Sequence, residues 1–264
     1  MSVLVAIPAR YASTRYPGKP LVSLKGPDGE KTLIRRSWEA AVAVRGVDRV
    51  VVATDDARIA DHAAGFGAEV VMTSSACQNG TERCAEVAAA LPGYEVVVNL
   101  QGDAPLTPAW FVEELVAGLR ADPGADIATP VLRCDGRAVA GFLADRRAGR
   151  VGGTTAVFGA GGRALYFSKE VIPYTGKTWA DEDPTPVFHH VGVYAYRPAA
   201  LAAYPSWPVG PLETLEGLEQ LRFLENGRKV LCVQVQARGR QFWELNNPSD
   251  VARIEAMMAE MGMA

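Results

Sequence analysis

The sequence lacks the features that mark several classes of protein. Only four of its 264 residues are cysteine, and none forms a Cys-x-x-Cys pair, which disfavours a disulfide scaffold and a thiolate zinc site. No apolar run approaches the ~20 residues of a membrane span. The net charge of −3 carries no basic excess for nucleic acid or anionic lipid. With no basic signal-peptide segment at the start, we expect a cytoplasmic protein that binds neither membranes nor nucleic acid.

The composition and periodicity are those of an α/β protein. Hydrophobic residues make up 48% and charged residues 22%, which suits a chain with a sizeable core. In the first half, short β-branched segments alternate with helical patterns, and apolar runs such as residues 96–98 are typical of a parallel sheet covered on both faces. We therefore predict a three-layer, doubly wound α/β fold with a mostly parallel twisted sheet. The expected strands are residues 3–8, 49–54, 69–73, 95–100 and 126–132.

The rhythm changes after residue 132. Residues 133–150 are predicted to be loop-rich, with several arginines, and residues 151–155 a turn that enters a strand. The rest predicts a smaller antiparallel lobe on the same sheet, within one domain of residues 1–264. Its expected elements are strands 163–168, 188–197 and 228–235, and helices 211–226 and 248–261.

The loop after the first strand is the first candidate site. It carries three cations, Arg10, Arg15 and Lys19, together with small residues and Gly18, which let the backbone approach a ligand closely. Cations and backbone amides in one loop suit a triphosphate, although a solvated basic loop is the alternative. The loop matches neither the P-loop nor the dinucleotide glycine pattern, which disfavours both mechanisms.

Two further segments could carry chemistry. Asp103 follows a buried strand and Gly102, where a carboxylate could hold Mg²⁺, although aspartate is also a common turn former. Residues 79–83 open a helix whose first amides could meet a base or a phosphate; a simple capping segment is equally compatible.

Several motifs occur together in one order along the chain. They are Pro8-Ala9-Arg10, Lys19-Pro20-Leu21, Ala53-Thr54-Asp55, Gly80-Thr81-Glu82-Arg83, Gln101-Gly102-Asp103, Ala164-Leu165-Tyr166-Phe167-Ser168 and Leu218-Glu219-Gln220-Leu221-Arg222. Over nearly its whole length the chain resembles the 3-deoxy-manno-octulosonate (Kdo) cytidylyltransferases, or CMP-Kdo synthetases. The resemblance implies a Rossmann-like nucleotidyltransferase fold, CTP and Mg²⁺ as reactants, and a cytoplasmic homodimer. In that family an acceptor oxygen attacks the α-phosphorus of CTP and pyrophosphate leaves.

The resemblance also implies roles for individual residues. Residues 1–132 would bind the nucleotide, and residues 133–264 the acceptor and a second subunit. Since adjacent strand residues point to opposite faces, only one of His189 and His190 can enter a pocket, and the family pattern selects His190. The implied catalytic residues are Arg10, Lys19 and Asp103; the nucleotide-binding residues are Pro8, Ala9, Arg10, Arg15, Lys19, Asn79, Thr81 and Gln101; the acceptor-binding residues are Gln101, Lys169, His190, Tyr194 and Glu219; the metal ligands are Asp103 and Asn246.

The chain departs from the family pattern mainly on the acceptor side. Asn246 replaces a metal-binding aspartate, with Glu244 as an alternative ligand, and Lys169 replaces an arginine. Thr155 and Ala104 stand where a lysine and a glutamate are usual. We therefore expect an acidic acceptor other than Kdo, such as phosphonoformate. Retention of Gln101, His190, Tyr194 and Glu219 argues for Kdo, which stays the alternative acceptor. A non-catalytic sensor of CTP or of a CMP conjugate is a further alternative.

Overall fold

The computed structural model describes residues 2–13, 15–151, 153–241 and 243–262. Thr14 of the predicted phosphate loop and Gly152 of the predicted turn therefore lie outside the described residues. The chain forms two compact units, and the second is inserted into the first. The first unit comprises Met1–Glu113, Tyr196–Ala202 and Ala237–Ala264; the second comprises Glu114–Ala195 and Ala203–Gln236.

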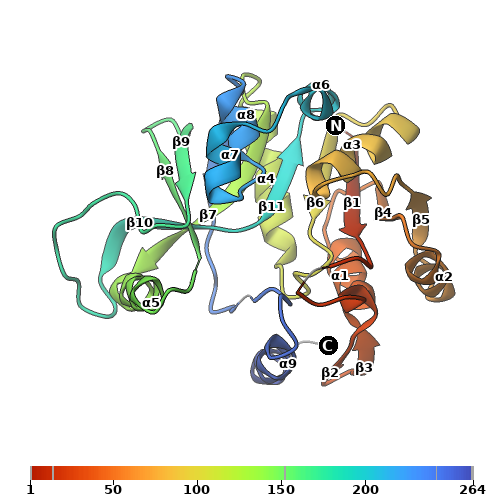
Figure 1. The fold of residues 1–264 in the computed structure, drawn as a ribbon, viewed down its shortest axis with the longest axis horizontal. Helices are drawn as coiled ribbons and strands as arrows, with labels where there is room; N and C mark the ends of the chain where they lie inside the picture. Colours follow the sequence, from red (N-terminus) through yellow and green to blue (C-terminus); the bar gives the residue numbers. More distant parts are fainter. Residues whose placement is uncertain (1, 14, 152, 242, 263–264) are drawn as a thin grey trace. The chain divides into compact units, whose positions relative to one another are not determined.

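The first unit contains four parallel strands. In spatial order they are β5 (Glu69–Met72), β4 (Arg49–Thr54), β1 (Val3–Ala9) and β6 (Val96–Leu100) (Figure 1). All five residues of β6 are buried, as its continuous apolar sequence predicts for a strand covered on both faces. Each of these strands lies within one residue of its predicted bounds. The predicted parallel α/β sheet is therefore confirmed.

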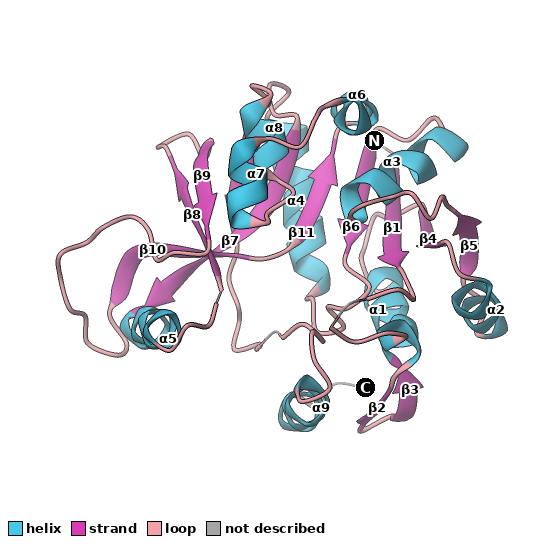
Figure 2. Cartoon of the chain, in the orientation of Figure 1, coloured by secondary structure: helices cyan, strands magenta, loops and turns pink. Residues whose placement is uncertain are grey.

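Helices connect these strands and cover the sheet (Figure 2). Right-handed crossovers from β1 to β4 and on to β5 place α1 (Leu33–Val42) and α2 (Ala57–Gly65) on one face. The return from β5 to β6 places α3 (Gly80–Ala90) on the opposite face, where it contacts β1 and β6. These helices and the sheet between them form the predicted three layers.

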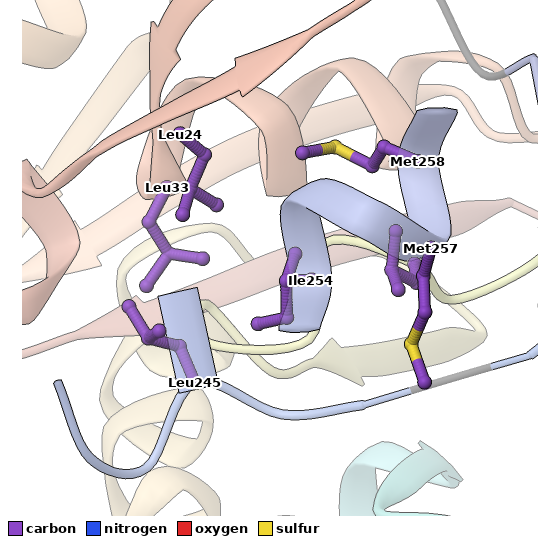
Figure 3. Packing of buried hydrophobic residues seen from close by; sticks show 7 residues of the cluster. Leu24, Leu33, Leu245, Ile254, Met257 and Met258 are labelled. Atoms are coloured by element: carbon purple, nitrogen blue, oxygen red, sulfur yellow. The ribbon is translucent and has the colours of Figure 1, made fainter. Parts of the chain in front are cut away.

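The last segment of the chain is anchored in the first unit by a hydrophobic cluster. Helix α9 (Asp250–Glu260) packs against β2 (Ser23–Gly26), which forms with β3 (Gly29–Thr32) a hairpin that sequence patterning did not predict. Each fully buried side chain of this kind stabilises the fold by roughly 1.5–3 kcal/mol. The buried members are Leu24, Leu33, Leu106, Leu245, Ile254, Met257 and Met258 (Figure 3).

The second unit is built on a largely antiparallel set of strands, as predicted for the smaller lobe. The spatial order is β11-β7-β10-β8-β9, and β12 runs parallel to β7. The strands are β7 (Ile127–Asp135), β8 (Thr154–Phe158), β9 (Ala164–Ser168), β10 (Pro184–His190), β11 (Val193–Tyr196, whose last residue belongs to the first unit) and β12 (Val230–Gln234). The helices not yet described belong to either unit. They are α4 (Ala109–Ala121), α5 (Gly136–Arg147), α6 (Pro198–Ala203), α7 (Pro211–Glu216) and α8 (Leu221–Glu225). Short 3₁₀ turns lie at Lys19–Leu21 in the first unit and at Tyr204–Ser206 in the second.

Three predictions for the second half were wrong. The loop-rich segment 133–150 contains helix α5, which begins where the Asp135 carboxylate accepts a hydrogen bond from the Ala138 amide at 2.7 Å. The single strand 188–197 is two strands, β10 and β11. The helix 211–226 is interrupted at Gly217, whose φ of 61° ends α7 in a left-handed cap.

None of the helices in the described ranges has the length and hydrophobicity that crossing a bilayer requires.

Candidate active site

The loop that follows β1 is closed on itself by Gly18. The Gly18 amide donates a hydrogen bond to the Tyr11 carbonyl at 2.9 Å, and its φ of 71° lies in the left-handed region. A Cβ at this position would also lie 3.0 Å from the Tyr11 ring. Glycine therefore suits both the backbone and the space, and it leads directly into the 3₁₀ turn that presents Lys19.

Gly102 brings the end of β6 against the end of β1. A Cβ on Gly102 would lie 2.6 Å from the Pro8 carbonyl oxygen, so only glycine allows this approach. The next residue, Asp103, thereby meets the loop after β1: Lys19 Nζ lies 2.5 Å from Asp103 Oδ2. The predicted phosphate-binding cation and metal-binding carboxylate are thus adjacent at the carboxyl ends of parallel strands, where ligands of such sheets bind.

The C-terminal segment around Leu245 forms the third side of the site. Its amide donates to the Asp103 carbonyl at 2.9 Å, and its carbonyl accepts from Lys19 Nζ at 3.1 Å. The Leu245 side chain is buried in the hydrophobic cluster of Figure 3, which fixes the backbone at the site. The neighbouring Asn246 Oδ1 accepts a hydrogen bond from Arg15 at 2.7 Å.

Asp250 fixes the backbone of the segment that carries Asn246. Its carboxylate accepts from the Asn246 amide at 3.0 Å, from the Asn247 amide at 2.6 Å and from Trp243 Nε1 at 3.0 Å. Burial opposes ionisation of Asp250, but these hydrogen bonds prevail and lower its pKa. The carboxylate is therefore ionised at neutral pH and keeps Asn246 in place.

A second carboxylate lies within electrostatic reach of Asp103. The pKa of Glu244 is raised to about 7, first by desolvation and then by the negative charge of Asp103, against opposing effects of Asn246, Lys19 and Arg15. Because Glu244 is exposed to solvent, desolvation contributes little, and repulsion by the Asp103 carboxylate is the cause that matters.

These oxygen donors fit a hard divalent cation. Mg²⁺ takes one or two carboxylates together with phosphate oxygens, and a cation would relieve the repulsion between Asp103 and Glu244. The described residues contain no cluster of three or more His, Cys, Asp or Glu side chains suited to a metal cage. The donor set therefore suits an ion that arrives with a phosphate ligand better than one enclosed by protein.

The start of α3 carries the predicted base-binding residues. Asn79 Oδ1 accepts from the Glu82 amide at 2.9 Å, so it caps the helix, and the buried Thr81 hydroxyl bonds to the Tyr196 hydroxyl at 2.9 Å. Both side chains thus have structural contacts, and their nucleotide-binding role stays a prediction. A Cβ on Gly80 would lie 3.4 Å from Gln101 Oε1, so Gln101 is close to the start of the helix.

The other predicted nucleotide-binding residues lie at the end of β1. Pro8 is half-buried, Ala9 is buried and Arg10 is exposed immediately after the strand. Arg15 lies in the loop that the Gly18–Tyr11 hydrogen bond closes, and Arg10 and Lys19 flank that loop; Arg10 and Arg15 are exposed to solvent. Such a group of cations favours a polyanionic ligand.

The predicted acceptor residues, apart from Gln101, lie in the second unit. The Lys169 amide donates to Glu216 Oε2 at 2.9 Å, and Ser168 Oγ donates to Glu216 Oε1 at 2.6 Å. Lys169 Nζ lies 3.0 Å from the place that a Cβ on Gly217 would take. Glu216 thus fixes the end of β9, and the absence of a side chain at Gly217 leaves room for Lys169 Nζ.

His190 and Tyr194 lie side by side in the same unit. Their ring centroids are 5.7 Å apart, and the Tyr194 hydroxyl donates to Gln220 Oε1 at 3.1 Å. Desolvation, followed by the nearby His189, lowers the pKa of His190 to about 3, so the ring is neutral at physiological pH. His189 packs against Phe142 at a centroid distance of 5.3 Å.

Four features of these surroundings were not predicted. Three of them contact residues that are distant in sequence, so no local pattern indicates them: the Leu245 carbonyl contacts Lys19, Glu216 contacts Ser168, and Thr129 of β7 contacts His190. The fourth is Asn99 of β6, fully buried, whose carboxamide has no hydrogen-bond partner within the described part of the chain. A polar residue inside the apolar run 96–100 was the available signal for it.

Comparison with known proteins assigns the family. The model of the cytidylyltransferase family matches residues 4–230. The chain is a cytidylyltransferase. It is 44% identical over 263 residues to the 3-deoxy-manno-octulosonate cytidylyltransferase of Maricaulis maris, covering 99% of each chain. The enzyme of the same name from Chlamydia trachomatis serovar L2 is 42% identical, over 94% of this chain and 91% of the relative.

A solved structure extends the similarity to the fold. The structure of CMP:2-keto-3-deoxy-manno-octonic acid synthetase complexed with CTP matches this cytidylyltransferase with a TM-score of 0.83 and 32% identity. The match covers 99% of this chain and 100% of the other. The predicted resemblance and the nucleotidyltransferase fold are therefore confirmed. The roles of individual residues, the metal, the homodimer and the cytoplasmic location stay predictions.

Proposed function

We propose that this cytidylyltransferase joins CMP from CTP to Kdo, with release of pyrophosphate. The observation that carries the proposal is the 44% identity to a 3-deoxy-manno-octulosonate cytidylyltransferase, which extends over both units of the chain. The expectation of a phosphonoformate acceptor has no support from the relatives, whose names favour the Kdo alternative. The CTP complex of the solved relative supports CTP as the nucleotide.

The first unit would bind the triphosphate of CTP. Arg10, just before the closed loop, and Arg15, within it, are exposed and would neutralise the β- and γ-phosphates, while Lys19 lies deeper, against Asp103. As the acceptor oxygen attacks the α-phosphorus, negative charge builds up on the transferred phosphoryl group and on the departing pyrophosphate. Preorganised cations stabilise this charge, and phosphoryl transfer needs little other help from protein beyond positioning.

The metal proposal concerns Asp103 and its neighbours. Mg²⁺ would supply charge neutralisation for the phosphate oxygens when bound. Asp103 would be its carboxylate ligand. The Glu244 carboxylate and the Asn246 amide oxygen, in the C-terminal segment, are the other candidate ligands. Asn246 lacks the negative charge of aspartate, so we expect weaker Mg²⁺ binding than a second carboxylate at that position would give.

The second unit would bind the acceptor. A neutral His190 and the Tyr194–Gln220 pair offer hydrogen bonds to hydroxyl groups, whereas a small trianion such as phosphonoformate requires clustered cations. Lys169 adds one positive charge for the carboxylate of a sugar acid. The combination of several neutral polar groups with one cation suits a hydroxylated monocarboxylate such as Kdo.

Parallel product analysis tests the proposal. The enzyme is incubated with CTP and Mg²⁺ plus either Kdo or phosphonoformate, and the products are identified by mass spectrometry. We expect CMP-Kdo and pyrophosphate, with no conjugate of phosphonoformate. A conjugate formed only with phosphonoformate would overturn the acceptor, and CTP binding without any product would favour a sensor. The Lys19→Met variant serves as the negative control.

A further inference from the structure

Thr129 of β7 makes an unusual set of contacts beside the proposed acceptor site. Its hydroxyl oxygen lies 2.8 Å from His190 Nε2, 2.9 Å from the Val193 carbonyl oxygen and 3.4 Å from the Val191 carbonyl oxygen. Thr129 is fully buried in the second unit. These contacts determine which nitrogen of His190 carries the proton.

The hydroxyl has one proton to donate, and two of its neighbours only accept. Carbonyl oxygens have no proton, so an approach of 2.9 Å between Thr129 Oγ1 and the Val193 carbonyl oxygen is favourable only if the hydroxyl donates to that carbonyl. The Thr129 oxygen then remains an acceptor towards the histidine. His190 must therefore carry its proton on Nε2 and donate it to Thr129.

The opposite ring nitrogen is thereby left as an acceptor. The ring is neutral, since burial lowers the pKa of His190 to about 3, and a neutral imidazole protonated on Nε2 has a lone pair on Nδ1. Nδ1 makes no hydrogen bond within the described residues, and 6% of the His190 surface stays accessible. The rings of Phe167 (4.9 Å) and Tyr194 (5.7 Å) hold the imidazole in this orientation.

We propose that Thr129 is a positioning residue that fixes the Nε2–H tautomer of His190, so that Nδ1 accepts a hydrogen bond from a hydroxyl group of the acceptor. The inference rests on the proposed function, because it requires a hydroxylated acceptor. It accounts for selectivity in physical terms: Nδ1 accepts from a donor, whereas a fully ionised acid without hydroxyl groups has no proton to offer it.

Nitrogen-15 NMR of labelled histidine tests the tautomer independently of activity. The chain has three histidines, so signals are assigned by their loss in the His62→Gln and His189→Gln variants. We expect the wild-type His190 to show a protonated Nε2 and a bare Nδ1, and the Thr129→Val variant to lose this single pattern. Protonation of Nδ1 in the wild type would overturn the inference.

Kinetics test the consequence for the acceptor. Thr129→Val should raise the KM for Kdo about tenfold with little change in the KM for CTP, and Thr129→Ser, which retains the hydroxyl, should restore both. Thr185 is a matched control: it is equally buried in the same unit, and its hydroxyl donates to the Cys134 carbonyl at 2.9 Å. Thr185→Val should leave the KM for Kdo unchanged.

The outcomes separate this inference from the proposed function. An unchanged KM for Kdo in Thr129→Val, with wild-type turnover of Kdo, would overturn the inference and leave the proposed function standing. Equal increases in the Thr185→Val control would show a general packing effect and would also overturn it. If the wild type does not turn over Kdo, the proposed function fails while the NMR result still decides the tautomer.

Discussion

Replacement of Lys19 by methionine is the most direct test of the nucleotide site. Lys19 Nζ donates to Asp103 at 2.5 Å and to the Leu245 carbonyl at 3.1 Å, and methionine keeps most of the side-chain length without the charge. Loss of one preorganised group that stabilises transition-state charge costs about 10²–10³ in kcat, or about 3–4 kcal/mol. The side chains of Lys19 and Asp103 are only 14% and 22% exposed, so the variant leaves a largely buried carboxylate without its partner, and we expect a loss of about 1–2 kcal/mol of folding stability.

The assay is pyrophosphate release at saturating CTP and acceptor, with urea unfolding of the same preparations. Lys25→Met is the matched control, because Lys25 is an exposed lysine on β2 of the same unit. The control should retain wild-type turnover. A Lys19→Met enzyme within threefold of wild-type kcat would refute the assignment of Lys19 to the reacting phosphates. A loss of stability as large as the loss of activity would point to misfolding instead.

Three further predictions follow from the same structure. Asn246→Asp should lower the Mg²⁺ concentration needed for half-maximal activity several-fold, and an identical titration would remove this position from the metal site. Gly18→Ala should cost about 1–2 kcal/mol of stability, because alanine is strained at a φ of 71°, and should weaken CTP binding measured by calorimetry; unaffected binding would contradict the role of the closed loop. His190 has a pKa of about 3 in the fold and about 6.5 in the unfolded chain, so the unfolded state takes up the proton first and stability is lost as the pH falls below about 6.5. Urea unfolding at pH 7.5 and 5.5 should therefore differ by about 1 kcal/mol more in the wild type than in His190→Gln, and equal differences in the two proteins would contradict a buried neutral ring.

The parallel sheet could be predicted because its signal is local. Strands such as β4 and β6 are short apolar segments bounded by turn residues, and burial on both faces requires that composition. The second half was harder because tertiary contacts override local composition there. The arginine-rich segment after Asp135 forms α5 once that aspartate caps it, and Gly217 divides a helical pattern that has no other obvious break.

The candidate site shows the same division between local and distant contacts. Lys19 and Asp103 could be placed at one sheet edge because both follow parallel strands, and the structure brings them into contact. The contribution of Leu245 could not be predicted, because it depends on the packing of α9 against β2. The Thr129–His190 contact joins residues 61 apart, which no motif or period connects.

The insertion of the second unit into the first has a consequence for biogenesis. The Leu245 segment that contacts Lys19 and Asp103 is synthesised after the whole second unit, so a nascent chain that already contains β1 and β6 still lacks one side of the candidate site. Domains generally fold in the order in which they emerge, and here the inserted one is complete first. A growing chain therefore cannot complete the candidate site until the Leu245 segment has emerged and α9 has packed against β2.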